Sequence, residues 1–219
     1  MPKPYLSLLL ALLVLPLSAQ AATVEDTARY RLDIAYAWSA ETHPDGFPDN
    51  AHFTRVIGAV HHGLYNLFRD GDTASSGLAL VATNGRITVL QAELDEAMRR
   101  GRVNSAFEAA ASDSGTGTVT TEISVTTRHS LVSFATMLAP SPDWLTGISD
   151  VDLRQDDAWL DTVTVTLWAW DAGADSGPDF IAENADTQPR QSVRLLVHPN
   201  FVYGDGVRPI GAATFTRIQ

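Results

Sequence analysis

Two apolar stretches in the second half of the chain alternate in a way that predicts β-strands. Over residues 162–170, the valine, leucine and alanine side chains fall at odd positions, while threonine and tryptophan fall at even ones. A period of two is typical of a half-buried strand. Over residues 130–138 both faces are mostly apolar, which favours a central strand covered on both sides. Pro140 and Pro142 end this second stretch because proline cannot donate to a strand ladder.

The rest of the chain adds further strands and one helix. Alternating or apolar runs predict strands over 30–38, 119–127, 192–198 and 212–218. A helix is predicted over 88–100, with Thr88 and Gln91 as a capping box and Gly101 after its end. The stretch 53–68 is ambiguous and is interpreted as short helical pieces and loop. These patterns together predict a mainly β fold with one or two short helices.

The first 21 residues carry the pattern of a secretory signal peptide. Lys3 is followed by an apolar run over 8–15 and by small residues at Ala19 and Ala21. A membrane anchor is the alternative, but the run is shorter than the roughly 20 apolar residues that span a bilayer, and Pro16 interrupts it. We therefore expect cleavage after Ala21, a single domain over 22–219 with no transmembrane segment, and a secreted or periplasmic location.

Composition narrows the classes of partner. The chain has no cysteine, so no disulfide can stabilise it after export. Its 15 basic and 26 acidic residues give a formal net charge of −11. A polyanion would be repelled by such a chain. Nucleic-acid binding and unaided adsorption to an anionic membrane are therefore not expected.

Three aspartates follow the two apolar stretches and are candidate metal ligands. Asp143 comes after the first stretch, and Asp171 and Asp175 come after the second, beside glycine. If both stretches lie in one sheet with these ends together, the carboxylates converge as hard oxygen ligands, which suit Ca²⁺. The alternative is that they are ordinary turn and capping residues. The pair Asp70 and Asp72 lacks the terminal glutamate of an EF-hand loop and is interpreted as a turn.

A hydrolase is the alternative class of function. Asp143 and Asp175 could form an acid/base pair, or one of His61, His62 and His129 could act as a base. Adjacent side chains point in different directions, so His61 and His62 cannot easily serve one ion, and a hydrogen-bonded core histidine is expected for at least one of them. The sequence contains no nucleophile elbow and no zinc signature. We therefore do not expect an enzyme.

Three separated motifs resemble the spondin N-terminal domain, the module shared by F-spondin and mindin. They are RHSLVSF at 128–134, PSPDW at 140–144 and WDAGADSG at 170–177, and they occur in the family's order. Earlier short matches include Trp38-Ser39, His43-Pro44 and the ASSG run at 74–77. The resemblance covers about 30–180.

The resemblance implies an antiparallel β-sandwich similar to C2 domains, with one calcium ion held by loop aspartates. The aspartate after Ser-Pro falls on Asp143, and the two that flank Ala-Gly-Ala fall on Asp171 and Asp175. Animal members are extracellular-matrix or adhesion proteins, and mindin-like ones are associated with integrins and with microbial surface glycans. The resemblance thus implies a secreted calcium-binding adhesion or surface-recognition module whose protein or glycan ligand is unknown. Calcium-dependent lipid binding, by analogy with C2 domains, is a further alternative.

Overall fold

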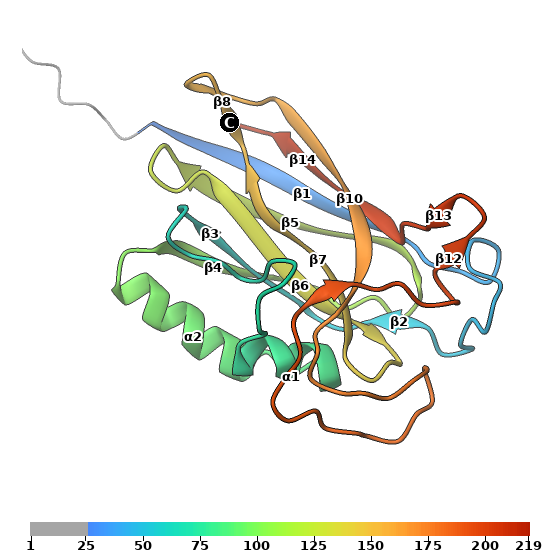
Figure 1. Ribbon diagram of the computed structural model, residues 1–219. Coiled ribbons are helices and arrows are strands. Elements are labelled where there is room, and N and C mark those ends of the chain that lie inside the picture. The colour runs from blue at the N-terminus through green and yellow to red at the C-terminus, as the bar shows by residue number, and fades with distance from the viewer. Residues whose placement is uncertain (1–25) are drawn as a thin grey trace, which may run out of the picture.

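The fold is built around one large antiparallel sheet. The computed structural model describes residues 26–219, so the signal peptide expected at 1–21 lies outside the described residues. Along the sheet the strands run in the order β4-β3-β6-β7-β10-β14-β1-β5 (Figure 1). Their bounds are β1 Thr27–Ala37, β3 Val56–His61, β4 Val103–Ala109, β5 Thr116–Thr126, β6 Leu131–Ala139, β7 Trp144–Asp152, β10 Thr162–Asp171 and β14 Gly211–Arg217. The expected class, a mainly β antiparallel sandwich, is confirmed.

Short strands extend this sheet or form hairpins beside it. β2 (His52–Phe53) pairs with β6, and β11 (Arg194–Leu195) pairs with β10. β8 (Arg154–Gln155) pairs with β9 (Ala158–Trp159), and β12 (Val202–Tyr203) pairs with β13 (Gly206–Val207). The pairing of β11 with β10 places Arg194 opposite Asp171, the last residue of β10.

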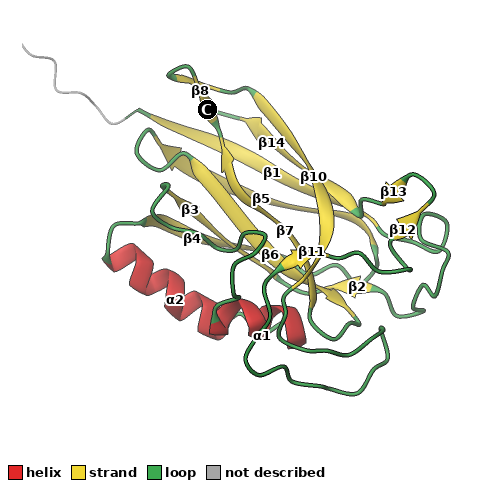
Figure 2. Ribbon diagram, viewed as in Figure 1, coloured by secondary structure: helices red, strands yellow, loops and turns green. Residues whose placement is uncertain are grey.

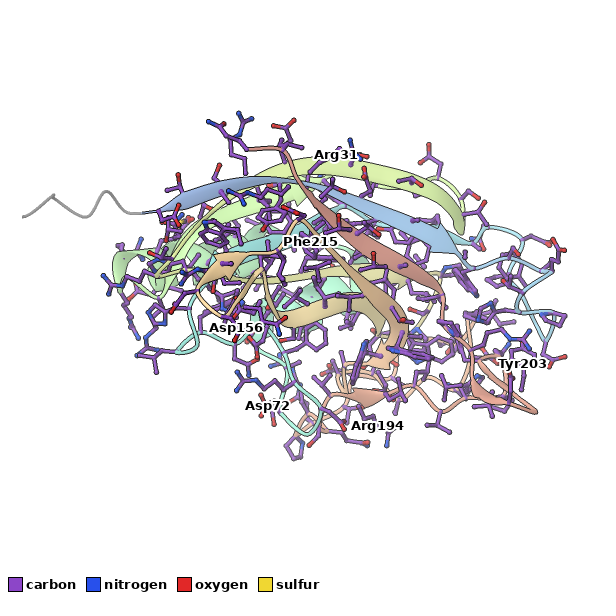
Figure 3. The ribbon with its side chains drawn as sticks, turned by 90° about the horizontal axis from the view of Figure 1, so that it is seen from above. Arg31, Asp72, Asp156, Arg194, Tyr203 and Phe215 are labelled. Carbon is purple, nitrogen blue, oxygen red and sulfur yellow. The ribbon has the colours of Figure 1, made fainter. Side chains whose placement is uncertain are left out.

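The sheet curls so that its two halves face each other across an apolar core. Tyr30 and Leu32 of β1, Phe134 of β6 and Phe215 of β14 are all fully buried in this core. Figure 3 shows Phe215 between the two layers, with Arg31 on the outside of the same region. Side chains of β1 alternate between buried and exposed along its length. The period-two pattern of the sequence is therefore the pattern of core and solvent.

Two helices cover the outer face of one half of the sheet (Figure 2). They are α1 (Ser76–Asn84) and α2 (Thr88–Arg99). Leu78 of α1 and Leu94 of α2 pack with Ala135 of β6 and Leu145 of β7 in a second apolar core. β6 is therefore covered on both faces, as its sequence predicted. Neither helix is long and apolar enough to cross a bilayer, and the same holds for every helix in 26–219.

Two details of the helix prediction are wrong. The helix near 88–100 is confirmed as α2, but Ile87 occupies its N-cap position without any side-chain cap, so Thr88 and Gln91 form no capping box. α1 was not predicted, because its mostly small and apolar residues show little amphipathic contrast. Its start is nevertheless marked by Ser75, whose side chain accepts a hydrogen bond from the Leu78 N–H at 3.1 Å.

Two strand assignments also need correction. The stretch 53–68 contains β3 instead of helical pieces, and every residue of β3 is buried, so no period of two is visible. Gly58 is needed there because a Cβ atom would lie 2.4 Å from the Phe107 ring. The strand expected over 192–198 shrinks to the two residues of β11. The strand expected over 212–218 is confirmed as β14.

Candidate metal centre

A strand that was not predicted brings the first aspartate to the other two. The two apolar stretches form β6 and β10. Both strands lie in one sheet, but β7 lies between them. β7 begins at Trp144, and Trp144 is the cross-strand partner of Asp171, the last residue of β10. Asp143 therefore immediately precedes the residue opposite Asp171. The ends of the two apolar stretches therefore lie at the same end of the sheet, with the start of β7 between them.

Asp143 is buried at this end of the sheet, between the start of β7 and the loop that follows β10. Its side chain is completely inaccessible to solvent. The Oδ2 atom accepts hydrogen bonds from the backbone N–H groups of Ala174 at 2.6 Å and Asp175 at 3.0 Å. The Oδ1 atom is also buried and has no hydrogen-bond partner. A buried carboxylate oxygen without a partner is costly, and it marks a position where a cation or a water molecule would be stabilised.

Asp171 and Asp175 organise the loop that follows β10. Asp171 Oδ1 accepts from the Gly173 N–H at 2.7 Å. Asp175 Oδ1 accepts from the Gly177 N–H at 2.7 Å, and its Oδ2 accepts from the Ala185 N–H at 2.9 Å. All three aspartates therefore act as turn and loop acceptors, which was the alternative interpretation of the sequence. Asp143 Oδ1 accepts no hydrogen bond, and Asp171 Oδ1 and both Asp175 oxygens accept one each, so lone pairs remain for binding of an ion.

The electrostatics of this end of the sheet are unfavourable for a fully ionised Asp143. The pKa of the Asp143 carboxyl group is raised from 3.8 to about 6, chiefly by burial and also by the neighbouring Asp171 and Asp175 charges, against the two backbone N–H groups that lower it. A carboxylate in this position is destabilised without a nearby positive charge. The same pKa means that Asp143 is mostly ionised at neutral pH and available to a cation.

A cavity of about 400 Å³ opens beside these side chains. Its lining includes Trp144, Asp171, Asp175, Arg194 and His198. Arg194 Nη2 lies 3.0 Å from Asp171 Oδ2 and forms an ion pair with it. Figure 3 labels Arg194 in the region formed by the last third of the chain. Sequence reasoning missed Arg194, because only the pairing of β11 with β10 places it opposite Asp171.

The residues fit a calcium ion in chemistry, although they are not arranged as a formed cage. Within residues 26–219, no group of three or more histidine, aspartate or glutamate side chains is positioned to hold a metal as it stands. The reason is that most of the carboxylate oxygens are turned toward backbone N–H groups. The donor set is nevertheless all hard oxygen. With Asp143 ionised, three carboxylates and Arg194 carry a formal charge of −3 + 1 = −2, which matches one divalent ion.

The histidines considered as possible bases lie away from the three aspartates and have structural roles. His61 is fully buried, with Nε2 at 2.8 Å from Ser133 Oγ and Nδ1 at 3.1 Å from the His62 carbonyl oxygen. This confirms the expected hydrogen-bonded core histidine. His129 Nε2 lies 3.1 Å from the Gly101 carbonyl oxygen. His61 and His129 sit at the start of β6, whereas Asp143 follows its end. His61 and His129 therefore cannot share a site with the three aspartates.

Comparison with known proteins gives a consistent match. A family model described as Spondin_N matches residues 28–200. The chain is 34% identical over 218 residues to Spondin-2 of Rattus norvegicus, covering 93% of this chain and 66% of that protein. It is 33% identical to Spondin-2 of Homo sapiens, covering 88% of this chain and 62% of that protein. With Spondin-1 of Gallus gallus the identity is 35%, over 82% of this chain and 23% of that protein. The chain thus spans less than two thirds of these relatives.

Proposed function

The chain belongs to the spondin N-terminal domain family, and we propose that it is a secreted, non-catalytic module for adhesion or surface recognition that binds calcium at Asp143, Asp171 and Asp175. The observation that carries this proposal is the buried, unpartnered Oδ1 atom of Asp143 beside two further carboxylates. Burying an ionised carboxylate without a partner is unfavourable, and a bound cation removes that cost.

Calcium fits the site better than magnesium does. Calcium accepts six to eight oxygen ligands in flexible geometry, while magnesium demands a near-ideal octahedron. The three carboxylates come from two segments and are also bound to backbone N–H groups, so they cannot easily adopt one strict geometry. A bound calcium ion would supply positive charge and join the start of β7 to the loop after β10. Asp143, Asp171 and Asp175 would hold it.

The proposed recognition surface is the loop region around this ion. The segment after β10 contributes most of the residues that line the cavity, including Asp175, Gln191 and His198. A loop that is fixed by an ion is pre-organised, so less conformational entropy is lost when a partner binds. The partner is a protein or glycan surface outside the cell or in the periplasm. The relatives are named as spondins, and we propose an adhesion role for the present chain.

Hydrolysis is less well supported by the geometry. Asp143 is the group whose pKa is raised to about 6, which is a useful value for a general acid. Its side chain, however, is fully buried and already accepts two backbone hydrogen bonds. A general acid must reach the atom to which it gives its proton. Asp143 is therefore better suited to holding an ion beneath the loop than to contacting a substrate.

Thermal denaturation in calcium and in magnesium tests the proposal. Ligand that binds only the folded protein stabilises it by mass action, by about 1.4 kcal/mol at ten times Kd. Extracellular calcium modules bind at about 10⁻⁴ to 10⁻³ M, so the titration should reach several millimolar. We expect Tm to rise with calcium and to rise less with magnesium.

Two asparagine variants make the test specific. Asp171→Asn weakens one oxygen ligand and should reduce the rise in Tm, while the calcium-free protein stays folded. Asp70→Asn removes one carboxylate from an exposed loop residue outside the proposed site and should leave the rise unchanged. A rise in Tm that is equal for wild type and Asp171→Asn, or that is lost in Asp70→Asn, would contradict the assignment.

A further inference from the structure

We infer that Arg194 is a built-in counter-ion of the aspartate site and lowers its affinity for calcium. This inference rests on the proposed function, because it concerns the cation that the site would take. The guanidinium group neutralises one of the three carboxylates in the metal-free protein, and an incoming cation must bind against its positive charge. Arg194 thereby sets the calcium concentration at which the site fills.

The position of Arg194 is fixed by strand pairing and not only by the ion pair. Arg194 of β11 is the cross-strand partner of Asp171 of β10. The Leu196 N–H donates to the Ala169 carbonyl at 2.9 Å, and the Gln191 N–H donates to the Gly173 carbonyl at 2.7 Å. Backbone hydrogen bonds therefore hold the segment on both sides of Arg194. The backbone of Arg194 therefore stays beside Asp171 when an ion enters, which keeps the guanidinium within reach of the site.

The contact itself uses a single carboxylate oxygen. Arg194 Nη2 and Nε lie 3.0 and 3.3 Å from Asp171 Oδ2, while the other oxygen of Asp171 accepts from the Gly173 N–H. The Asp171 side chain is 14% exposed and that of Arg194 is 60% exposed. Of the ion pairs formed within residues 26–219, only this one involves an aspartate of the proposed site. Arg194 is thus the basic side chain that balances the site directly.

The charge of the site shows what Arg194 does to a cation. Three carboxylates alone carry −3, and with Arg194 the sum is −2. The extra positive charge reduces repulsion between Asp171 and Asp143 in the absence of calcium, which helps the loop to stay ordered. It also repels a divalent ion. At a separation of about 6 Å in a water-like dielectric, this repulsion corresponds to about a tenfold loss of affinity.

Calorimetric titration of calcium into wild type and three variants tests the inference. Arg194→Gln removes the charge, and we expect its Kd for calcium to fall about tenfold while its calcium-free Tm decreases. Arg194→Lys keeps the charge and should bind nearly as wild type does. Arg190→Gln is the matched control, because Arg190 comes from the same segment but its guanidinium lies 3.4 Å from the Ala74 carbonyl and not against Asp171. Its Kd should change little.

The outcomes separate this inference from the proposed function. If wild type binds calcium and Arg194→Gln binds no more tightly, the proposed function stands and the inference is wrong. If Arg190→Gln gains as much affinity as Arg194→Gln, the effect is one of overall charge and the inference is also wrong. If neither wild type nor Arg194→Gln binds calcium, both are wrong. An Arg194→Gln protein that folds only in calcium would support the inference, and one that stays unfolded in saturating calcium would overturn it.

Discussion

Asp143 holds Asp175 in place through the backbone, since its Oδ2 atom accepts the Asp175 N–H at 3.0 Å. The first aspartate of the proposed site therefore positions the third. Asp143 also accepts the N–H of Ala174, so one buried side chain at the start of β7 fixes the beginning of the loop that follows β10. Loop order and cation binding are consequently linked through a single residue.

Substitution of Asp143 should separate these two roles. Asp143→Ala removes the acceptor of two buried N–H groups, and each unsatisfied group costs about 1–3 kcal/mol. Asp143→Asn keeps one oxygen acceptor and removes the buried charge, so its calcium-free stability should lie close to that of wild type. Both variants should lose the calcium response. Urea denaturation with and without calcium provides the measurement, and an alanine variant as stable as wild type would argue against the linkage.

The pKa of Asp143 predicts how calcium-free stability depends on pH. The folded protein raises this pKa from 3.8 to about 6, so the folded state binds the proton more tightly than the unfolded state does. The resulting stabilisation is fully present below about pH 4 and is lost as pH rises through about 6. As pH falls from about 7.5 to about 5, protonation of Asp143 should therefore raise the free energy of unfolding by about 1 kcal/mol.

Comparison with Asp143→Asn isolates this contribution, because other groups titrate in the same range. The difference in unfolding free energy between wild type and Asp143→Asn should shift in favour of wild type as pH falls. In saturating calcium the shift should disappear, since the ion competes with the proton. A difference that does not vary with pH in calcium-free buffer would show that Asp143 has no raised pKa.

The histidines should matter for stability and not for calcium. Burial lowers the pKa of His61, so its contribution to stability is complete above its ordinary pKa of about 6.5 and is lost as pH falls below that value. His61→Ala removes a fully buried side chain with two hydrogen bonds, and about 2–4 kcal/mol of destabilisation is expected. His62→Ala, at a partly exposed position, should cost less. A hydrolytic activity lost in a folded His61→Ala protein would instead favour an enzyme.

Much of this architecture could be predicted, for identifiable physical reasons. β1, β10 and β14 each bury one face, so their sequences alternate and reveal them. β6 is apolar on both faces and ends at Pro140, which also makes it recognisable. The three aspartates could be singled out because they follow such strands beside glycine.

The parts that escaped prediction depend on long-range packing. β3 is buried on both faces and contains Gly58, so its sequence lacks the alternation of a half-buried strand. β7 had no predicted boundary, yet the pairing of its first residue, Trp144, with Asp171 brings Asp143 to the end of β10. Arg194 lies 23 positions after Asp171, and only the register of two short paired segments brings them together. No local pattern in the sequence encodes that register.

Gly173 should be the most sensitive backbone position of the site. Its φ is +68°, and a Cβ atom would lie 2.4 Å from the Gln191 carbonyl oxygen. Gly173→Ala should therefore push apart the loop after β10 and the segment that carries Arg194, at a cost on the order of 1–3 kcal/mol. Gly101→Ala is the matched control, because Gly101 has the same φ of +68° and nothing lies within 4 Å of the added atom. Equal Tm values for the two variants would contradict this close packing.

Calcium binding at the three aspartates is tested most directly by titrating calcium into the ¹⁵N-labelled protein and monitoring its amide NMR signals. The N–H groups of Gly173, Ala174, Asp175, Gly177 and Ala185 donate to the three carboxylates, so an ion bound there must change their chemical shifts. If Asp143, Asp171 and Asp175 bind calcium, these five signals shift together and saturate at millimolar calcium. Signals that stay in place, or shifts that gather around Asp70 and Asp72 instead, would contradict binding at the three aspartates.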